Sequence, residues 1–235
     1  MNITENVLSI KSKIAEAART AGRSPEDITL VAATKMNGAE AVRQAILAGV
    51  PVCGENRAQE LTEKYAQGAY EGAGVHFIGH LQKNKARQVV GVCSLIQSVD
   101  SVGLLAHIDK LARELGIIQD VLLEVNVGGE ETKYGFSPEQ LPPVLEQVSN
   151  MSGVRVRGLM TIPPISDYKG RNRVCFARMY QLFIDISAKK YDNVYMNFLS
   201  MGMSGDFEDA IAEGSNMVRV GSAIFGPRIY PAADK

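Results

Sequence analysis

The sequence predicts a single (β/α)8 TIM barrel with an additional N-terminal helix, and three observations support this prediction. The chain has 235 residues, 46% of them hydrophobic, so it can bury one large core and falls in the size range of one barrel. Short runs rich in Val, Ile and Leu alternate with helical patterns along the chain, as expected for a parallel sheet. No Pro-rich linker, low-complexity segment or change in composition divides the sequence, so we expect one domain over residues 1–235.

The elements can be assigned in order along the chain. An amphipathic pattern predicts an opening helix over about residues 3–20. Strand-like runs follow at 28–34, 51–54, 76–78, 95–99, 121–127, 155–160, 195–199 and 217–220. Helical patterns lie between them at 39–47, 58–66, 102–115, 138–148 and 174–188, and cap-like residues such as Ser101 and Ser137 precede two of these. About eight β/α units close a barrel, whereas a doubly wound open sheet normally uses fewer strands and a Gly-rich first turn, which is missing here.

Composition narrows the classes of partner. The 25 basic and 26 acidic residues nearly cancel, so no overall field attracts nucleic acid or an acidic membrane surface. Cys53, Cys93 and Cys175 are odd in number and in no metal-ligand pattern, which argues against a disulfide framework and for a reducing compartment. We interpret all three as small hydrophobes rather than as catalytic residues. The N-terminus has neither a long apolar run nor a cleavage-site pattern, so we expect a cytoplasmic protein.

In a barrel, reactive groups lie at the carboxyl ends of the strands and in the loops that follow. The first strand delivers Lys35 to this end, and a lysine partly withdrawn from water can act as a neutral amine that attacks an aldehyde or ketone. An isolated lysine at a strand end would more often extend to solvent. The loops after the seventh and eighth strands change this interpretation.

These two loops offer hydroxyls, small residues and approachable backbone amides at 200–204 and 219–222. Barrels frequently bind phosphate in this position, although Gly and Ser also form ordinary turns. A Schiff-base lysine and a phosphate cradle at one mouth predict a site for a phosphorylated carbonyl compound, and pyridoxal 5'-phosphate fits that description.

Three further residues complete the predicted polar ring at the mouth. Arg219 ends the eighth strand and could face the phosphate, the pyridine nitrogen or a neighbouring carboxylate such as Glu213. Asn56 and His80 follow the second and third strands, and each could contact a ligand or cap a helix.

Six motifs then resemble the YggS/PROSC family of pyridoxal phosphate homeostasis proteins. They are Gly-Glu-Asn-Arg at 54–57, His-Phe-Ile-Gly-His-Leu-Gln at 76–82, Thr-Lys-Tyr-Gly-Phe at 132–136, Gly-Leu-Met-Thr at 158–161, Leu-Ser-Met-Gly-Met-Ser at 199–204 and Val-Arg-Val-Gly-Ser-Ala-Ile-Phe-Gly at 218–226. The resemblance implies a barrel like the N-terminal domain of alanine racemase, with the cofactor on Lys35. It also implies site residues in four roles: Ser200, Met201, Ser204, Gly221 and Ser222 at the phosphate, Arg219 at the pyridine nitrogen, Asn56 and Met160 along the ring, and His80 nearby. Thr34 and Met36 flank the lysine where the family pattern is closer to Ser-Lys-Thr, and no Trp precedes His76.

The expected function is binding and homeostasis of pyridoxal 5'-phosphate, without robust catalysis. A racemase needs an acid and a base on opposite faces of the substrate carbon, the second normally from an added β domain, and the chain ends at Lys235 without room for it. We therefore expect no catalytic residues, a monomer, and transient contact with apoenzymes that use the cofactor. An amino-acid racemase and a cofactor-free Schiff-base aldolase acting on a phosphorylated sugar remain the alternatives. We interpret the basic cluster Lys83, Lys85 and Arg87 as a solvated helix face or as a second phosphate contact.

Overall fold

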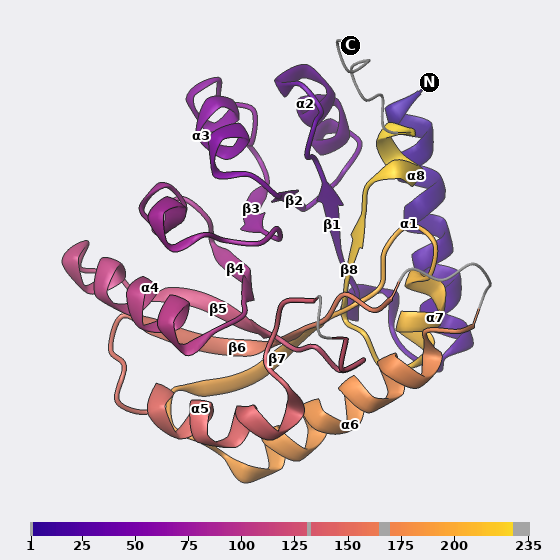
Figure 1. The fold of residues 1–235 in the computed structure, drawn as a ribbon. Helices are drawn as coiled ribbons and strands as arrows, with labels where there is room; N and C mark the ends of the chain where they lie inside the picture. The colour runs from indigo at the N-terminus through magenta and orange to yellow at the C-terminus, as the bar shows by residue number, and fades with distance from the viewer. Residues whose placement is uncertain (1, 131–132, 165–169, 228–235) are drawn as a thin grey trace, which may run out of the picture.

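Eight parallel strands close into a barrel in the computed structural model, which describes residues 2–130, 133–164 and 170–227 (Figure 1). The strands are β1 (Thr29–Ala33), β2 (Val52–Glu55), β3 (Gly74–Phe77), β4 (Leu95–Val99), β5 (Gln119–Glu124), β6 (Val154–Met160), β7 (Val194–Ser200) and β8 (Met217–Val220). Neighbours in the barrel follow chain order, and β8 closes it by pairing with β1, with Arg219 opposite Val31. The predicted TIM barrel is confirmed.

Helices surround the barrel. They are α1 (Ile3–Thr20), α2 (Ala39–Leu47), α3 (Ala58–Ala66), α4 (Val102–Glu114), α5 (Leu141–Val148), α6 (Arg173–Lys189), α7 (Phe207–Ala212) and α8 (Ser222–Phe225). After β3, the short 3-10 helix η2 (Lys83–Gln88) takes the place of an α-helix. The predicted additional N-terminal helix is α1, which packs beside α2, α7 and α8 (Figure 1). The Asn6 side-chain amide ties it to α8 by donating to the Ile224 carbonyl at 2.8 Å.

Helix α4 shows how local sequence sets the bounds of an element. Ser101 caps its start, since the Ser101 hydroxyl accepts a hydrogen bond from the Leu104 amide at 3.3 Å. Leu104, Ile108 and Leu111 recur on one face and are buried. The helix ends before Gly116, whose φ of 66° lies in the left-handed region that glycine tolerates best.

The hydrophobic core has two layers. The larger layer lies between the outer face of the strands and the helices. A smaller cluster fills the barrel interior and consists of Val31, Ile78, Leu95, Leu122, Met160 and Met217. Strands β6 and β7 approach so closely that a Cβ on Gly158, at φ 143°, would lie 1.9 Å from the Phe198 carbonyl oxygen. Glycine is therefore required at this position of the barrel wall.

The fifth predicted strand ends earlier in the structure than expected. The run at 121–127 predicts a strand to Val127, but β5 ends at Glu124 and Val125 forms only an isolated bridge with Phe136. This bridge brings the described part of the 132–136 motif to the barrel mouth, whereas Thr132 lies outside the described residues. All three cysteines are free; Cys53 and Cys93 are buried, as expected of small hydrophobes, whereas Cys175 is only half-buried. No helix in the described part of the chain is long and apolar enough to cross a membrane.

Candidate cofactor site

Five of the ten predicted site residues meet at one cavity of about 250 Å³ at the carboxyl ends of the strands. Lys35 lies two residues beyond β1 and enters the cavity from one side. The cavity is also lined by Ser204 from the loop after β7. Arg219 on β8, and Gly221 and Ser222 just after it, line the cavity as well. The fold thus brings a candidate nucleophile next to the predicted phosphate cradle.

Backbone amides at the start of α8 converge on one oxygen position in this cradle. The Ser204 hydroxyl oxygen accepts hydrogen bonds from the Gly221 amide at 3.1 Å and from the Ala223 amide at 3.4 Å. A Cβ on Gly221 would lie 3.3 Å from the Ala33 Cβ, so a larger residue would crowd β1 where the chain passes closest. Converging amides beside hydroxyls suit phosphate oxygens, and these residues therefore fit a phosphorylated ligand.

Arg219 is buried beneath the cavity, with only 4% of its surface exposed. Its Nη1 donates to the Ser200 hydroxyl oxygen at 2.6 Å and its Nη2 donates to the Thr161 carbonyl at 2.9 Å. Burial lowers the pKa of Arg219 to about 10, which leaves the guanidinium charged at neutral pH. The alternative partner Glu213 lies instead 3.5 Å from Arg173.

A chain of hydrogen bonds continues from Arg219 across the barrel interior. The buried Ser200 hydroxyl donates to Gln97 Oε1 at 2.6 Å, and Gln97 Nε2 lies 2.9 Å from His76 Nδ1. Burial lowers the pKa of His76 to about 4, so this imidazole is neutral at physiological pH. We call Arg219, Ser200, Gln97 and His76 the polar floor; they lie beneath the cavity with their side chains already hydrogen-bonded, and of the four Arg219 lines the cavity itself.

Three predicted contacts lie in the protein interior. Ser200, Met160 and Met201 are fully buried. Ser200 belongs to the polar floor, Met160 to the inner cluster, and the Met201 amide donates to the Met217 carbonyl at 3.1 Å. None of the three is among the residues that line the Lys35 cavity in the described structure. Their assignment to the phosphate and the ring stays a prediction.

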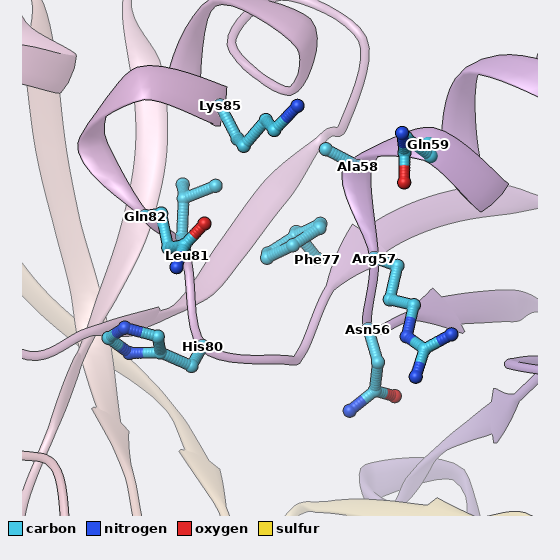
Figure 2. Close-up of a pocket in the computed structure, with 9 residues that line it drawn as sticks. All are labelled: Asn56, Arg57, Ala58, Gln59, Phe77, His80, Leu81, Gln82 and Lys85. Atoms are coloured by element: carbon cyan, nitrogen blue, oxygen red, sulfur yellow. The ribbon is translucent and has the colours of Figure 1, made fainter.

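Asn56 and His80 line a neighbouring cavity of about 230 Å³ between the loops after β2 and β3 (Figure 2). His80 Nδ1 lies 2.9 Å from Asp100 Oδ2, and the His80 ring stacks on Tyr134 at a centroid distance of 3.8 Å. The buried Asn56 Oδ1 has no hydrogen-bond partner among the described residues. Lys85 also lines this cavity, so one residue of the basic cluster is partly withdrawn from solvent (Figure 2).

Glu124 adds an acidic group that sequence reasoning missed. It ends β5 and is only 7% exposed. Burial, and next the negative charge of Asp100, raise the pKa of Glu124 to about 7, against the opposing effect of Arg219. A carboxyl with this pKa changes its charge in the neutral pH range.

Sequence reasoning also gave no role to Gln97, Glu55, Lys64 and Thr161. The motifs at 54–57 and 158–161 contain Glu55 and Thr161, so the motif pattern marked both positions. Their roles come from their partners. Thr161 accepts a hydrogen bond from Arg219, which is distant in sequence, and Glu55 accepts one from Lys64 on α3. Gln97 carried no signal, since a single polar residue in an apolar strand is common.

Comparison with known proteins identifies the family. Residues 6–229 match the family model described as alanine racemase, N-terminal domain. A protein of Aquifex aeolicus named pyridoxal phosphate homeostasis protein is 41% identical over 230 residues, which cover 98% of this chain and all of that protein. A protein of Pseudomonas aeruginosa with the same name is 39% identical over 98% of this chain and 97% of its own length.

Solved structures agree with these sequence matches. The structure of PipY of Synechococcus elongatus with PLP bound is 33% identical, covers 95% of this chain and 100% of its own, and has a TM-score of 0.83. An alanine racemase of Clostridium difficile, 18% identical, has a TM-score of 0.71 over 99% of this chain and 58% of its own, which shows a shared fold. The chain therefore belongs to the alanine racemase N-terminal domain family and, within it, to the pyridoxal phosphate homeostasis proteins.

Proposed function

We propose that this chain binds pyridoxal 5'-phosphate as a Schiff base on Lys35 and acts in intracellular vitamin B6 homeostasis without robust substrate turnover. The observation that carries the proposal is the meeting of Lys35 with Ser204, Gly221 and Ser222 around one cavity. The related PipY structure contains the same cofactor.

The cavity residues divide the work of binding. The Lys35 amine supplies the covalent link to the aldehyde, and the Gly221 and Ala223 amides with the Ser204 and Ser222 hydroxyls supply donors for the phosphate. We assign Ser200 and Met201 to the same phosphate region, and Asn56, Met160 and His80 to the surroundings of the ring. The orphaned Asn56 oxygen offers an acceptor at the edge of the mouth.

Arg219 supports a carrier rather than an enzyme. When bound, the pyridine ring of the cofactor supplies an electron sink whose strength depends on protonation of its nitrogen. A guanidinium donates hydrogen bonds and does not give up its proton, so Arg219 at this nitrogen favours the weaker sink. Binding is thereby retained while carbanion chemistry is disfavoured.

The remaining parts of the proposal follow from this role. We assign the whole of residues 1–235 to one cofactor-binding domain and expect a cytoplasmic monomer. Transient contact with apoenzymes would let the bound cofactor be passed on.

The absorption spectrum of the purified protein, recorded before and after borohydride, tests the proposal. A visible band that borohydride abolishes, with a pyridoxyl adduct mapped to Lys35 by mass spectrometry, is the expected result. Lys35→Ala should abolish the band, whereas Lys189→Ala, at an exposed position on α6, should keep it. A protein that stays colourless after incubation with pyridoxal 5'-phosphate would contradict the proposal and favour the aldolase alternative.

Turnover is tested separately on D- and L-alanine, serine and lysine. We expect neither racemisation nor transamination above the rate with free cofactor. Product formed faster than this rate would make the racemase the better assignment.

A further inference from the structure

Lys35 lies between two residues whose backbones are held by side chains of β2 and α3. On one side, the Thr34 hydroxyl donates to Glu55 Oε1 at 2.5 Å, and Lys64 Nζ donates to the Thr34 carbonyl at 2.8 Å. Lys64 Nζ also donates to Glu55 Oε1 at 2.7 Å. The hydroxyl and the carbonyl of Thr34 are thus both tied to one ion pair.

On the other side, Glu60 holds Met36. The Met36 amide donates to Glu60 Oε2 at 2.7 Å, and the same oxygen lies 3.5 Å from Lys64 Nζ. Met36 has a φ of 62°, in the left-handed region that a residue with a side chain rarely adopts. Such a conformation persists only where surrounding contacts enforce it, and strained residues of this kind cluster at functional sites. We call Glu55, Glu60 and Lys64 the Lys64 clamp.

Burying the charges of the clamp carries a desolvation penalty. Glu55 is fully buried and Lys64 is 6% exposed, so both charged groups are removed from solvent. Three donors, from Thr34, Lys64 and Tyr70, share Glu55 Oε1, whereas Oε2 has no partner among the described residues. A buried ion pair is often no more stabilising than well-packed apolar residues. Its local effect here is to fix the backbone on both sides of Lys35.

We propose that Lys64, with Glu55 and Glu60, is a positioning group that fixes the backbone around Lys35 and so orients its amine for imine formation. This inference rests on the proposed function of Lys35. In that reaction the neutral amine adds to the aldehyde carbon, a C=N bond replaces the C=O bond, and one water leaves. The clamp acts on Lys35 through Thr34 and Met36.

Two variants of Glu60 separate positioning from loss of charge. Glu60→Gln keeps a side-chain oxygen that can accept from the Met36 amide, whereas Glu60→Met removes it, and both remove the negative charge near Lys64. The Glu60 side chain is 19% exposed, so both variants should fold. Asp109→Asn serves as the control, because the buried Asp109 pairs with Arg113 at 2.9 Å and accepts from the Gly153 amide, with no contact to the clamp.

The first measurement is the rate constant for growth of the visible band when pyridoxal 5'-phosphate is added to cofactor-free protein. Glu60→Met should lower it about tenfold or more, because small displacements of a reacting group slow reaction strongly. Glu60→Gln should remain within about twofold of the wild type, as should Asp109→Asn even if it lowers the melting temperature.

The second measurement needs no cofactor. Acetylation of Lys35 by limiting acetic anhydride is compared, within each molecule, with that of exposed Lys189. The Lys35 to Lys189 ratio should rise in Glu60→Met, because a released Lys35 becomes more accessible, and should stay at the wild-type value in Glu60→Gln.

The outcomes separate this inference from the proposed function. A wild type that forms no visible band sinks the proposed function, while the acetylation ratios still decide whether the clamp holds Lys35. If both Glu60 variants behave alike in both measurements, or if Asp109→Asn slows imine formation as much as Glu60→Met, the positioning role is overturned and the clamp is only structural.

Discussion

The pH dependence of stability should change when Glu124 is replaced by glutamine. Glu124 is 7% exposed at the end of β5, and burial together with the charge of Asp100 raises its pKa from 4.5 to about 7. A rise of this size corresponds to about 3 kcal/mol of unfolding free energy. This free energy destabilises the folded protein when Glu124 is ionised.

The sign follows from the direction of the shift. Since the folded pKa is higher than the unfolded one, the contribution of Glu124 to stability is fully present below the unfolded value of 4.5 and is lost as pH rises through about 7. Glutamine has no such ionisation. Glu124→Gln should therefore gain up to about 3 kcal/mol over the wild type at about pH 8, and much less at about pH 5.

Urea denaturation of both proteins across this pH range gives the difference directly. Glu114→Gln is the control, since the Glu114 side chain is 42% exposed and contacts Arg87 and Lys110 at the surface. Its effect on unfolding free energy should be small at every pH. A difference between Glu124→Gln and the wild type that is the same at both ends of the range would refute the reasoning.

Three further outcomes are expected. Gly158→Ala places a Cβ 1.9 Å from the Phe198 carbonyl oxygen and should lower the unfolding free energy by more than about 3 kcal/mol, or prevent folding, while Gly38→Ala, with open space around it, should melt near the wild-type temperature. Ser204→Ala removes the hydroxyl that two amides share and should weaken binding of pyridoxal 5'-phosphate about tenfold in an equilibrium titration; unchanged affinity would place the phosphate elsewhere. The His76 ring should stay neutral down to about pH 4 when its nitrogens are followed by NMR, and a midpoint near 6.5 would show that it is not buried as described.

Strand periodicity predicted the architecture well because most of the apolar runs lie on a wall buried on both faces, although alternate residues at the start of β7 are exposed. Its limits appear where tertiary contacts decide the boundary. The run at 121–127 continues as an apolar pattern to Val127, yet pairing with β6 stops at Glu124, and Phe136 then takes up the backbone groups of Glu124 and Asn126. The local sequence pattern does not predict that the backbone changes its hydrogen-bond partner from β6 to Phe136.

The candidate site shows a similar division. Strand-end logic brought Lys35, Ser204, Gly221 and Ser222 to one mouth because carboxyl ends of parallel strands always meet there. The same logic could not predict that the Ser200 hydroxyl accepts a hydrogen bond from Arg219 and donates one to Gln97 inside the barrel. The hydrogen-bond partners of this hydroxyl are residues far away in sequence.

Under the proposed function, the polar floor would let the fold bind the cofactor firmly and restrain its chemistry. Arg219 donates to Ser200 and Thr161, and Ser200 passes the contact on to Gln97, so the direction of the guanidinium is set before any ligand arrives. Buried networks whose members are satisfied are rigid, and a rigid donor holds a ring nitrogen without exchanging a proton with it. The group of neutral-range pKa at the mouth, Glu124, stands on β5, across the barrel from Lys35 on the β1 side, and its charge is coupled to Arg219. In the proposed carrier, Arg219 would hold the ring nitrogen without supplying a proton to it, while the charge of Glu124 would change in the neutral pH range on the opposite strand.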